Sequence, residues 1–291
     1  MTQASQASNI GFEFITSLST ELGRGEIELP AFPEVALRIK DALKDPEVSA
    51  KSIATIAASD PVLSARFLQV ANSAMINACG TEIRDLNMAI ARMGFKLAQS
   101  TATSFAIEHS VKSGASASTR KQLEPLWSHS IEVAAFSFVI AEKLAKNINP
   151  DEAMLAGLLH DIGKFYILSK MEACPEMLAS AELFDNIMHD WHTGVGRSIV
   201  EAWNFTNDFA TVTDEHDTLD RSHVGQADLT DVVLVANVLS HFKHGEAQQA
   251  PDWANIPAAK KIGISEATAG LILDDSAEEI KSIVNALGIN K

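Results

Sequence analysis

The chain has 291 residues, two cysteines and a formal net charge of −15, from 38 acidic and 23 basic side chains. A chain of this length can bury a core without disulfides, so it forms one large domain or two small ones. The acidic balance argues against nucleic-acid binding, which needs a basic face. The N-terminus has no signal-peptide pattern and no apolar run reaches 18 residues, so we expect no membrane contact and a reduced, cytoplasmic location.

Apolar residues recur at three- and four-residue spacings along most of the chain, which predicts an all-α fold. The pattern predicts helices over 10–22, 34–43, 51–58, 61–72, 85–92 and 96–109. Prolines keep 29–33 extended, Gly94 breaks the helical pattern, and Ser49 and Asp60 are predicted N-caps, with Pro61 at a first helical position. Surface loops are expected over 218–226 and 243–253, and amphipathic helices over 258–273 and 277–287.

The run Ser-Gly-Ala-Ser-Ala-Ser at 113–118 is the strongest linker signal in the chain. It divides the chain into an N-terminal helix within 1–25, a helical lobe over 26–112, the linker over 113–118, and a second helical lobe with C-terminal helices over 119–291. No internal repeat is present.

Eight of the nine histidines follow residue 125, and four of them have surroundings that favour a function. His129 shares one face of its predicted helix with apolar residues, so it points toward the core. Taken alone, it is explained by a buried histidine that bonds to a carbonyl. His192 and His216 lie in polar segments, where a surface or capping role is the simpler interpretation. His189, His223, His241 and His244 have only that simpler interpretation.

His160 and Asp161 follow a strongly apolar helical segment. Burying an adjacent imidazole and carboxylate is costly unless a partner compensates both. Small residues at Ala153, Ala156 and Gly157 let another helix approach closely on the same side. Either a metal ion or an Asp–His hydrogen bond inside the core would satisfy the pair.

Imidazoles and a carboxylate on separate helices are the usual all-helical way to hold Fe, Mn or Zn. Such an ion lowers the pKa of water and polarises a phosphoryl oxygen. Lys164, one turn after His160, is placed to neutralise a phosphate, although a solvated lysine on a helix face is the alternative. Asp161 and Lys164 are therefore the candidate catalytic residues.

The order of His129, the His160–Asp161 pair and the later histidines resembles the HD phosphohydrolase superfamily. Its members use a His, a His-Asp pair and a distal Asp as metal ligands, and the segment 160–164 (HDIGK) is similar to their signature. His192, His216 and the stretch 203–205 resemble the HD-GYP branch, which holds a second metal. The resemblance implies one or two divalent transition-metal ions (Fe, Mn or Zn), with these ligands: His129, His160, Asp161, His192, His216 and Asn237.

The N-terminal half resembles one family within this superfamily, the HDOD (HD-related output domain) family. The similar segments are Leu29–Pro33, Asp60–Leu63, Ala71–Ala74, Ala89–Ile90 with Met93–Gly94, and the tail Ile256–Ser265. The resemblance covers about residues 26 to 288. It implies an HD-like helical bundle with two lobes, and a bacterial signalling module that acts by binding partners.

Two departures bear on activity. Asn237 stands where the superfamily has its distal Asp, and an amide is a poorer, uncharged ligand for a hard cation. The Gly-Tyr-Pro signature of the HD-GYP branch is absent, and Tyr166 is the only tyrosine. Both departures argue against hydrolysis of cyclic dinucleotides.

Three functions stay open on the sequence. The first is an HDOD-type signal-transduction protein with a retained metal site, which acts through protein partners in trans or a small phosphorylated ligand, on a groove between the lobes. The second is an active metal-dependent phosphohydrolase on a nucleotide or other phosphoester. The third is a plain helical scaffold whose histidines are satisfied core residues.

Overall fold

The computed structural model describes residues 3–24, 34–73, 76–77, 80–112, 116–174, 177, 180–203, 205–243 and 251–287. These residues form helices and no strand, so the all-α prediction is confirmed. None of the described helices is both long and apolar enough to cross a membrane. The predicted linker residues 113–115, the extended segment 29–33 and most of the predicted loop 243–253 lie outside the described residues.

The N-terminal lobe comprises α2 (Glu34–Ala42), α3 (Ala50–Ala57), α4 (Pro61–Ala71) and α5 (Leu86–Lys112). The predicted caps are present: Ser49 accepts from the amide of Ser52, and Asp60 accepts from the second and third amides of α4, which begins with Pro61. Gly94 interrupts α5 with φ 75°, a left-handed conformation that only glycine adopts without strain, so the predicted break is confirmed.

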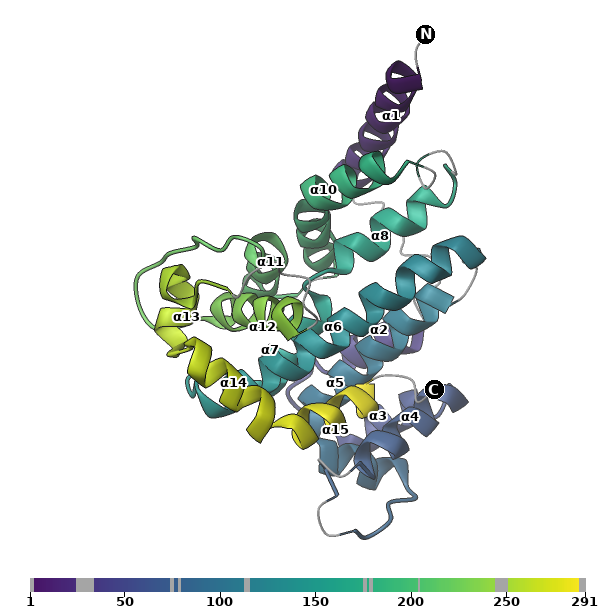
Figure 1. The fold of residues 1–291 in the computed structure, drawn as a ribbon. Coiled ribbons are helices and arrows are strands. Elements are labelled where there is room, and N and C mark those ends of the chain that lie inside the picture. Colours follow the sequence, from purple (N-terminus) through teal and green to yellow (C-terminus); the bar gives the residue numbers. More distant parts are fainter. Residues whose placement is uncertain are drawn as a thin grey trace.

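The C-terminal lobe begins with the long helix α6 (Ala117–Lys143), which is followed by α7 (Pro150–Leu159), α8 (Ile162–Met171) and α10 (Ala181–Ala202). It continues through α11 (Asn207–Glu215) and α12 (Leu229–Lys243) to the short α13 (Pro257–Ile262). α6 packs against α7 and α12, and α10 packs against α8 and α11. The core of this lobe lies where these helices converge, and Figure 1 shows α6 and α7 at its centre.

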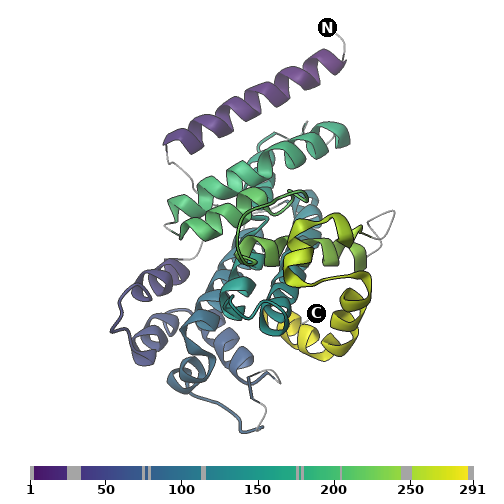
Figure 2. The same ribbon diagram turned by 90° about the vertical axis from the view of Figure 1, so that its left-hand side faces the viewer.

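The first and last helices, α1 and α15, each pack against segments that are distant from them in the sequence. α1 (Gln3–Arg24) packs on α10, not on the N-terminal lobe that follows it, and Figures 1 and 2 both show it on the far side from α2–α5. Its buried face presents Phe14 and Leu18. At the other end, α14 (Glu266–Asp275) leads to α15 (Ala277–Leu287), which returns to contact α4, α5 and α6. Ser104 on α5 donates a hydrogen bond to the carbonyl of Leu287 at 2.9 Å.

Candidate metal centre

The His160–Asp161 pair occupies the junction between α7 and α8. Every residue of α7 from Ala153 to Leu159 is buried, and α6 approaches so closely that a Cβ on Gly157 would lie 2.9 Å from the Cα of Ala134. Of the small residues predicted to allow this approach, Gly157 is the one at which it is seen. α7 ends at His160, and Asp161 precedes the first turn of α8, so both side chains turn into the core with at most 1 % exposure.

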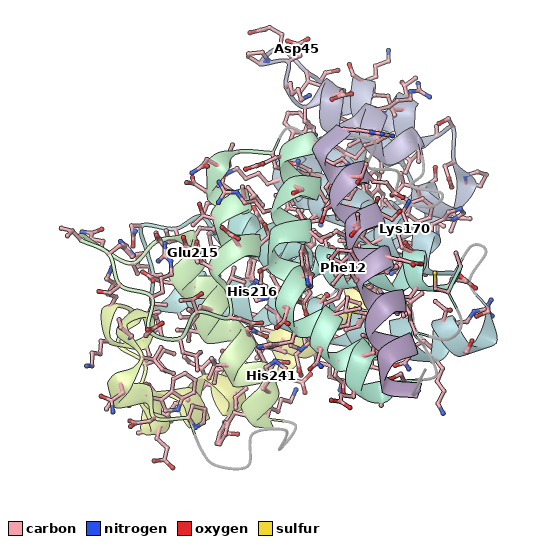
Figure 3. The ribbon with its side chains drawn as sticks, turned by 90° about the horizontal axis from the view of Figure 1, so that it is seen from above. Phe12, Asp45, Lys170, Glu215, His216 and His241 are labelled. Carbon is pink, nitrogen blue, oxygen red and sulfur yellow. The ribbon has the colours of Figure 1, made fainter. Side chains whose placement is uncertain are left out.

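The other three imidazoles come from three further helices. His129 projects from α6, His192 from α10, and His216 follows the last residue of α11. α10 approaches α8 closely because residue 163 is glycine: a Cβ there would lie 1.9 Å from the carbonyl oxygen of His192. Figure 3 shows His216 in the interior of the molecule, among the helices of this lobe.

Asp161 lies at the centre of the cluster and faces both halves of it. Its Oδ2 lies 3.4 Å from Nε2 of His160 and 3.9 Å from Nε2 of His129. Its Oδ1 lies 3.3 Å from Nε2 of His216 and 3.7 Å from Nε2 of His192. Two ligand atoms about 2.1 Å from a shared ion lie roughly 3.0–3.4 Å apart, so these spacings are close to those of a coordination shell.

Each of three imidazoles uses its Nδ1 for a hydrogen bond away from the centre. Nδ1 of His160 lies 2.7 Å from the carbonyl of Gly157, and the Nδ1 atoms of His192 and His216 face carbonyls of the preceding turn at 3.1 and 3.2 Å. A carbonyl only accepts, so these Nδ1 atoms carry the proton. The Nε2 lone pairs therefore point to the centre, which is the tautomer that binds a metal ion.

The centre lacks the donors that would satisfy these lone pairs. Nε2 of His192, Nε2 of His216 and Oδ1 of Asp161 are buried without a hydrogen-bond partner. Nε2 of His160 lies 3.3 Å from Nε2 of His129. Buried acceptors that face one another are costly unless a cation joins them. The donor set of imidazole nitrogens and a carboxylate thus fits a transition-metal ion better than a closed hydrogen-bond network.

Burial favours the neutral, metal-binding form of two of the imidazoles. Burial and the neighbouring His160 lower the pKa of His129 to about 3, and burial lowers the pKa of His160 as well. Burial would raise the pKa of Asp161, but His160 and Lys164 outweigh it and hold that pKa well below its usual range. Burial lowers the pKa of His216, but the adjacent carboxylate of Asp161 outweighs it and the net pKa is raised.

The structure adds Asp217 to the residues predicted from the sequence. Its Oδ2 lies 3.2 Å from Nε2 of His192 and 3.6 Å from Nε2 of His216. Burial would raise the pKa of this carboxyl, but the neighbouring imidazoles of His192 and His216 outweigh it, so the pKa is well below its usual range. The signal was present, since Asp217 directly follows a predicted ligand, but spacing alone does not show that it turns toward His192.

Asn237 lies beside this carboxylate, on α12. Its Nδ2 donates to Oδ1 of Asp217 at 2.8 Å, and its own Oδ1 is buried without a partner. The structure therefore brings the predicted Asn237 to the edge of the cluster, where it holds Asp217. Asp217 thus places a carboxylate beside the amide of Asn237 at this edge of the cluster.

Lys164, predicted as a phosphate-binding residue, lies at the rim. Its Nζ donates to Oδ2 of Asp161 at 2.8 Å, and its side chain is 21 % exposed. Burial would lower the pKa of Lys164, but Asp161 outweighs burial and raises it. The lysine is a charged neighbour of the cluster, and its side chain is only partly buried.

A second group of three candidate ligands, His223, Asp228 and Asp231, lies in the segment after Asp217. Here cations are already present. Arg221 donates to both Asp228 and Asp231 at 2.8 Å, and Lys261 lies 3.8 Å from Asp231. This group is an ion-pair network that closes the loop, so we do not assign a metal to it.

The comparisons with known proteins concern the family and the fold. The family model of the HDOD domain matches residues 29–219. A proposed metal-dependent phosphohydrolase from Shewanella amazonensis SB2B is 25 % identical, with a TM-score of 0.77 over 96 % of this chain and 99 % of that one. An HDOD domain protein of unknown function from Geobacter sulfurreducens is also 25 % identical, with a TM-score of 0.66 over 94 % and 98 %.

A curated relative, an uncharacterized protein from Treponema pallidum (strain Nichols), is 24 % identical over 244 residues. The match covers 79 % of this chain but only 46 % of that relative's length, so the chain spans about half of it. The family match covers well over half of the present chain, and the two structures match nearly all of it. The chain belongs to the HDOD family.

Proposed function

We propose that this chain is a signal-transduction protein that retains a metal centre of the HD type and acts by binding a partner protein or a small phosphorylated ligand. The observation that carries the proposal is the convergence of four Nε2 atoms on the buried carboxylate of Asp161. Asn237, an amide in place of the distal Asp, favours binding over turnover because it lowers the negative charge available to the ion.

Asp161 divides the cluster into two groups. His129, His160 and Asp161 form one set of ligand atoms that lie within 4.8 Å of one another, and Asp161, His192 and His216 form the other. Asp217 lies beside the second set. An Fe, Mn or Zn ion bound by either set would supply the positive charge and Lewis acidity that the chain's own residues lack.

The ligands come from separate helices, so the metal content of the cluster would affect the whole lobe. α6, the junction of α7 with α8, α10 and α11 each contribute a side chain. Free energy of metal binding adds to the stability of the arrangement that the ligands require. Metal occupancy would therefore fix how these helices present their outer surfaces to a partner.

A cavity of about 200 Å³ at the boundary of the lobes suits the ligand part of this proposal. Its walls combine Lys40, Lys44 and Lys96 with the rings of Phe205 and Phe209. Two carboxylates, Asp151 and Glu152, also line it, and Glu152 pairs with Lys96. α7 begins at this cavity and ends at His160, and α11 begins beside it and ends at His216. A small phosphorylated ligand bound here would contact α7 and α11, two of the helices whose ends carry cluster residues.

An active phosphohydrolase is the second candidate. Asp217 is 42 % exposed and Lys164 is 21 % exposed, so solvent reaches one side of the cluster. The Shewanella structure with a TM-score of 0.77 is itself a proposed metal-dependent phosphohydrolase. In this chain Lys164 would bind and orient a phosphate oxygen, while Asp161 and the histidines would hold the ion.

Metal content and turnover separate these candidates. The protein is purified without added metal, Fe, Mn and Zn are quantified, and a panel of phosphoesters is assayed before and after reconstitution. His192→Ala should lose metal, whereas the matched control His189→Ala, an exposed histidine on the same helix, should not. Metal without turnover supports the signalling proposal. Turnover that His192→Ala abolishes supports the hydrolase, and absence of metal after reconstitution refutes both.

A further inference from the structure

His129 differs from the other three imidazoles in what holds it. The Nδ1 atoms of His160, His192 and His216 each bond to a backbone carbonyl of their own helix. Nδ1 of His129 instead lies 3.2 Å from the hydroxyl of Ser240, which belongs to α12, 111 residues later in the chain. The orientation of this ligand therefore depends on side chains that can be changed by substitution.

A buried carboxylate fixes the direction of this hydrogen bond. The hydroxyl of Ser240 donates to Oε2 of Glu132 at 2.6 Å, and a hydroxyl has only one proton to donate. Toward His129 the serine oxygen can only accept, so Nδ1 of His129 carries the proton and its Nε2 lone pair faces the cluster. Ser240 is fully buried and Glu132 is 8 % exposed, so water does not compete for either bond.

The helical register brings these residues together. His129 and Glu132 are three residues apart on α6, so both face α12. On α12, Asn237 and Ser240 are also three residues apart, and both are buried. α12 therefore holds two of the cluster's side chains, since Asn237 bonds to Asp217 and Ser240 bonds to His129. Lys243 completes the chain of contacts by bonding to Oε1 of Glu132 at 2.6 Å.

We infer that Glu132 and Ser240 are positioning residues that hold His129 in its metal-binding tautomer and thereby set the metal affinity of the cluster. The effect on affinity rests on the proposed metal centre, but the effect on the tautomer does not. Loss of an outer hydrogen-bond partner of a ligand histidine typically costs about 10- to 100-fold in metal affinity.

Three variants test the chain of hydrogen bonds from Glu132 through Ser240 to His129, which we call the relay. Glu132→Gln keeps the shape but offers an amide donor to Ser240, which frees the serine proton for Nδ1 of His129 and moves the imidazole proton to Nε2. Ser240→Ala removes the relay, and Ser240→Thr restores a hydroxyl. Lys243→Met is the matched control, because it removes the ion pair of Glu132 at a residue that is 44 % exposed and leaves the relay in place.

Two readouts are used for each variant, with circular dichroism to show that the variant is folded. Nitrogen chemical shifts of the imidazoles in the metal-free protein report which nitrogen of His129 carries the proton. Competition with a chelator reports the affinity for Zn²⁺. We expect Nδ1–H in the wild type, a shift toward Nε2–H in Glu132→Gln, and Zn²⁺ affinity lowered about 10- to 100-fold in Glu132→Gln and Ser240→Ala. Ser240→Thr should recover affinity, and Lys243→Met should keep it near the wild-type value.

The outcomes distinguish the relay from the metal centre. A wild-type protein that binds no Zn²⁺ but has Nδ1–H on His129, lost in Glu132→Gln, would refute the metal centre and support the relay's control of the tautomer. Wild-type affinity in folded Glu132→Gln and Ser240→Ala, or Nε2–H on His129 in the wild type, would overturn the inference. Should Ser240→Ala fail to fold, Glu132→Gln alone decides by its tautomer.

Discussion

Gly163 is the position where one added methyl group should disturb the cluster most directly. A Cβ at this position would lie 1.9 Å from the carbonyl oxygen of His192 and 2.8 Å from the amide nitrogen of Gly196. Ordinary van der Waals contact begins at 3.4 Å, so α8 and α10 would have to separate by about 1.5 Å. Both atoms belong to the backbone of α10, and no rotamer change can relieve the overlap.

The separation acts on the metal ligands themselves. Asp161 lies two residues before Gly163, and His192 is the residue whose carbonyl would be struck. A metal site tolerates errors of only about 0.2 Å in ligand distance, far less than the required shift. For Gly163→Ala we expect metal affinity lowered at least about 100-fold, and an overpacking cost of about 1–3 kcal/mol. At about 2–4 °C per kcal/mol, the metal-free protein should lose roughly 2–12 °C in melting temperature.

Gly194→Ala is the matched control, two residues from His192 on the same helix. No atom lies within 4 Å of a Cβ at Gly194, so alanine should stabilise α10 by about 0.5–1 kcal/mol. Thermal unfolding followed by circular dichroism measures stability, and chelator competition measures Zn²⁺ affinity. A folded Gly163→Ala protein with wild-type Zn²⁺ affinity would refute the reasoning, as would an equal loss of affinity in Gly194→Ala.

The remaining predictions concern charged residues of the C-terminal lobe. Asp217→Asn should lower Zn²⁺ affinity about 10- to 100-fold. Asn237→Asp should raise Zn²⁺ affinity but lower the melting temperature of the metal-free protein, because the new carboxylate lies beside Asp217. A metal-free Asn237→Asp protein that is more stable than the wild type would contradict this. The pKa of His129 is about 3 in the metal-free fold and 6.5 for an unperturbed histidine, so between pH 6.5 and 3 the unfolded chain takes up its proton first. His129 should therefore lower the free energy of unfolding by up to about 1.4 kcal/mol for each unit that the pH falls in that window. Denaturant titrations at several pH values measure this dependence, and it should be smaller by that amount in His129→Gln. Arg221→Met should cost about 3–5 kcal/mol in urea unfolding, because it removes a partner of the buried Asp231, and a cost below about 1 kcal/mol would contradict that role.

Local signals identified several helix ends and most residues of the cluster. The predicted helix over 258–273 was wrong, because Gly263 with φ 83° ends α13 and a separate helix, α14, follows. Asp60 with Pro61 marks a helix start, and Gly94 marks a break, because each depends on the conformation of one or two residues. The His160–Asp161 pair stood out because an imidazole and a carboxylate followed a wholly apolar segment. In such cases the cost of the local arrangement is visible in the sequence itself.

Pairings between distant segments could not be predicted in this way. Ser240 meets Glu132 across 108 residues, and nothing in the sequence around either residue identifies the other. His241, which the sequence left as a polar residue, stacks on His129 with ring centroids 4.8 Å apart. α1 was expected as a separate N-terminal helix, but its apolar face could not show that α10 would be its partner. Such contacts are set by the tertiary arrangement, which periodicity does not encode.

The position of α12 connects the cluster to the rest of the molecule. It holds Asp217 through Asn237 and His129 through Ser240, and it packs against α7, α11 and α13. Beyond α13 the chain continues into α14 and α15, and α15 contacts α4 and α5 of the N-terminal lobe. A change in the cluster that moves α12 can therefore reach the boundary between the lobes through packed helices.

This connection makes a testable claim about signalling. Binding of Zn²⁺ should slow backbone hydrogen exchange in α12 and α13, which lie directly behind the ligands, and also in α15, which supplies none of them. Exchange in α3, which packs on α2, α4 and α5, is the internal control. If metal slowed exchange only in the helices that carry ligands, metal binding would stabilise the structure only locally. If α15 responded as well, metal occupancy would be transmitted beyond the helices that carry ligands to the surface formed by both lobes, and α6, which carries His129 and packs directly on α15, would be the shortest route.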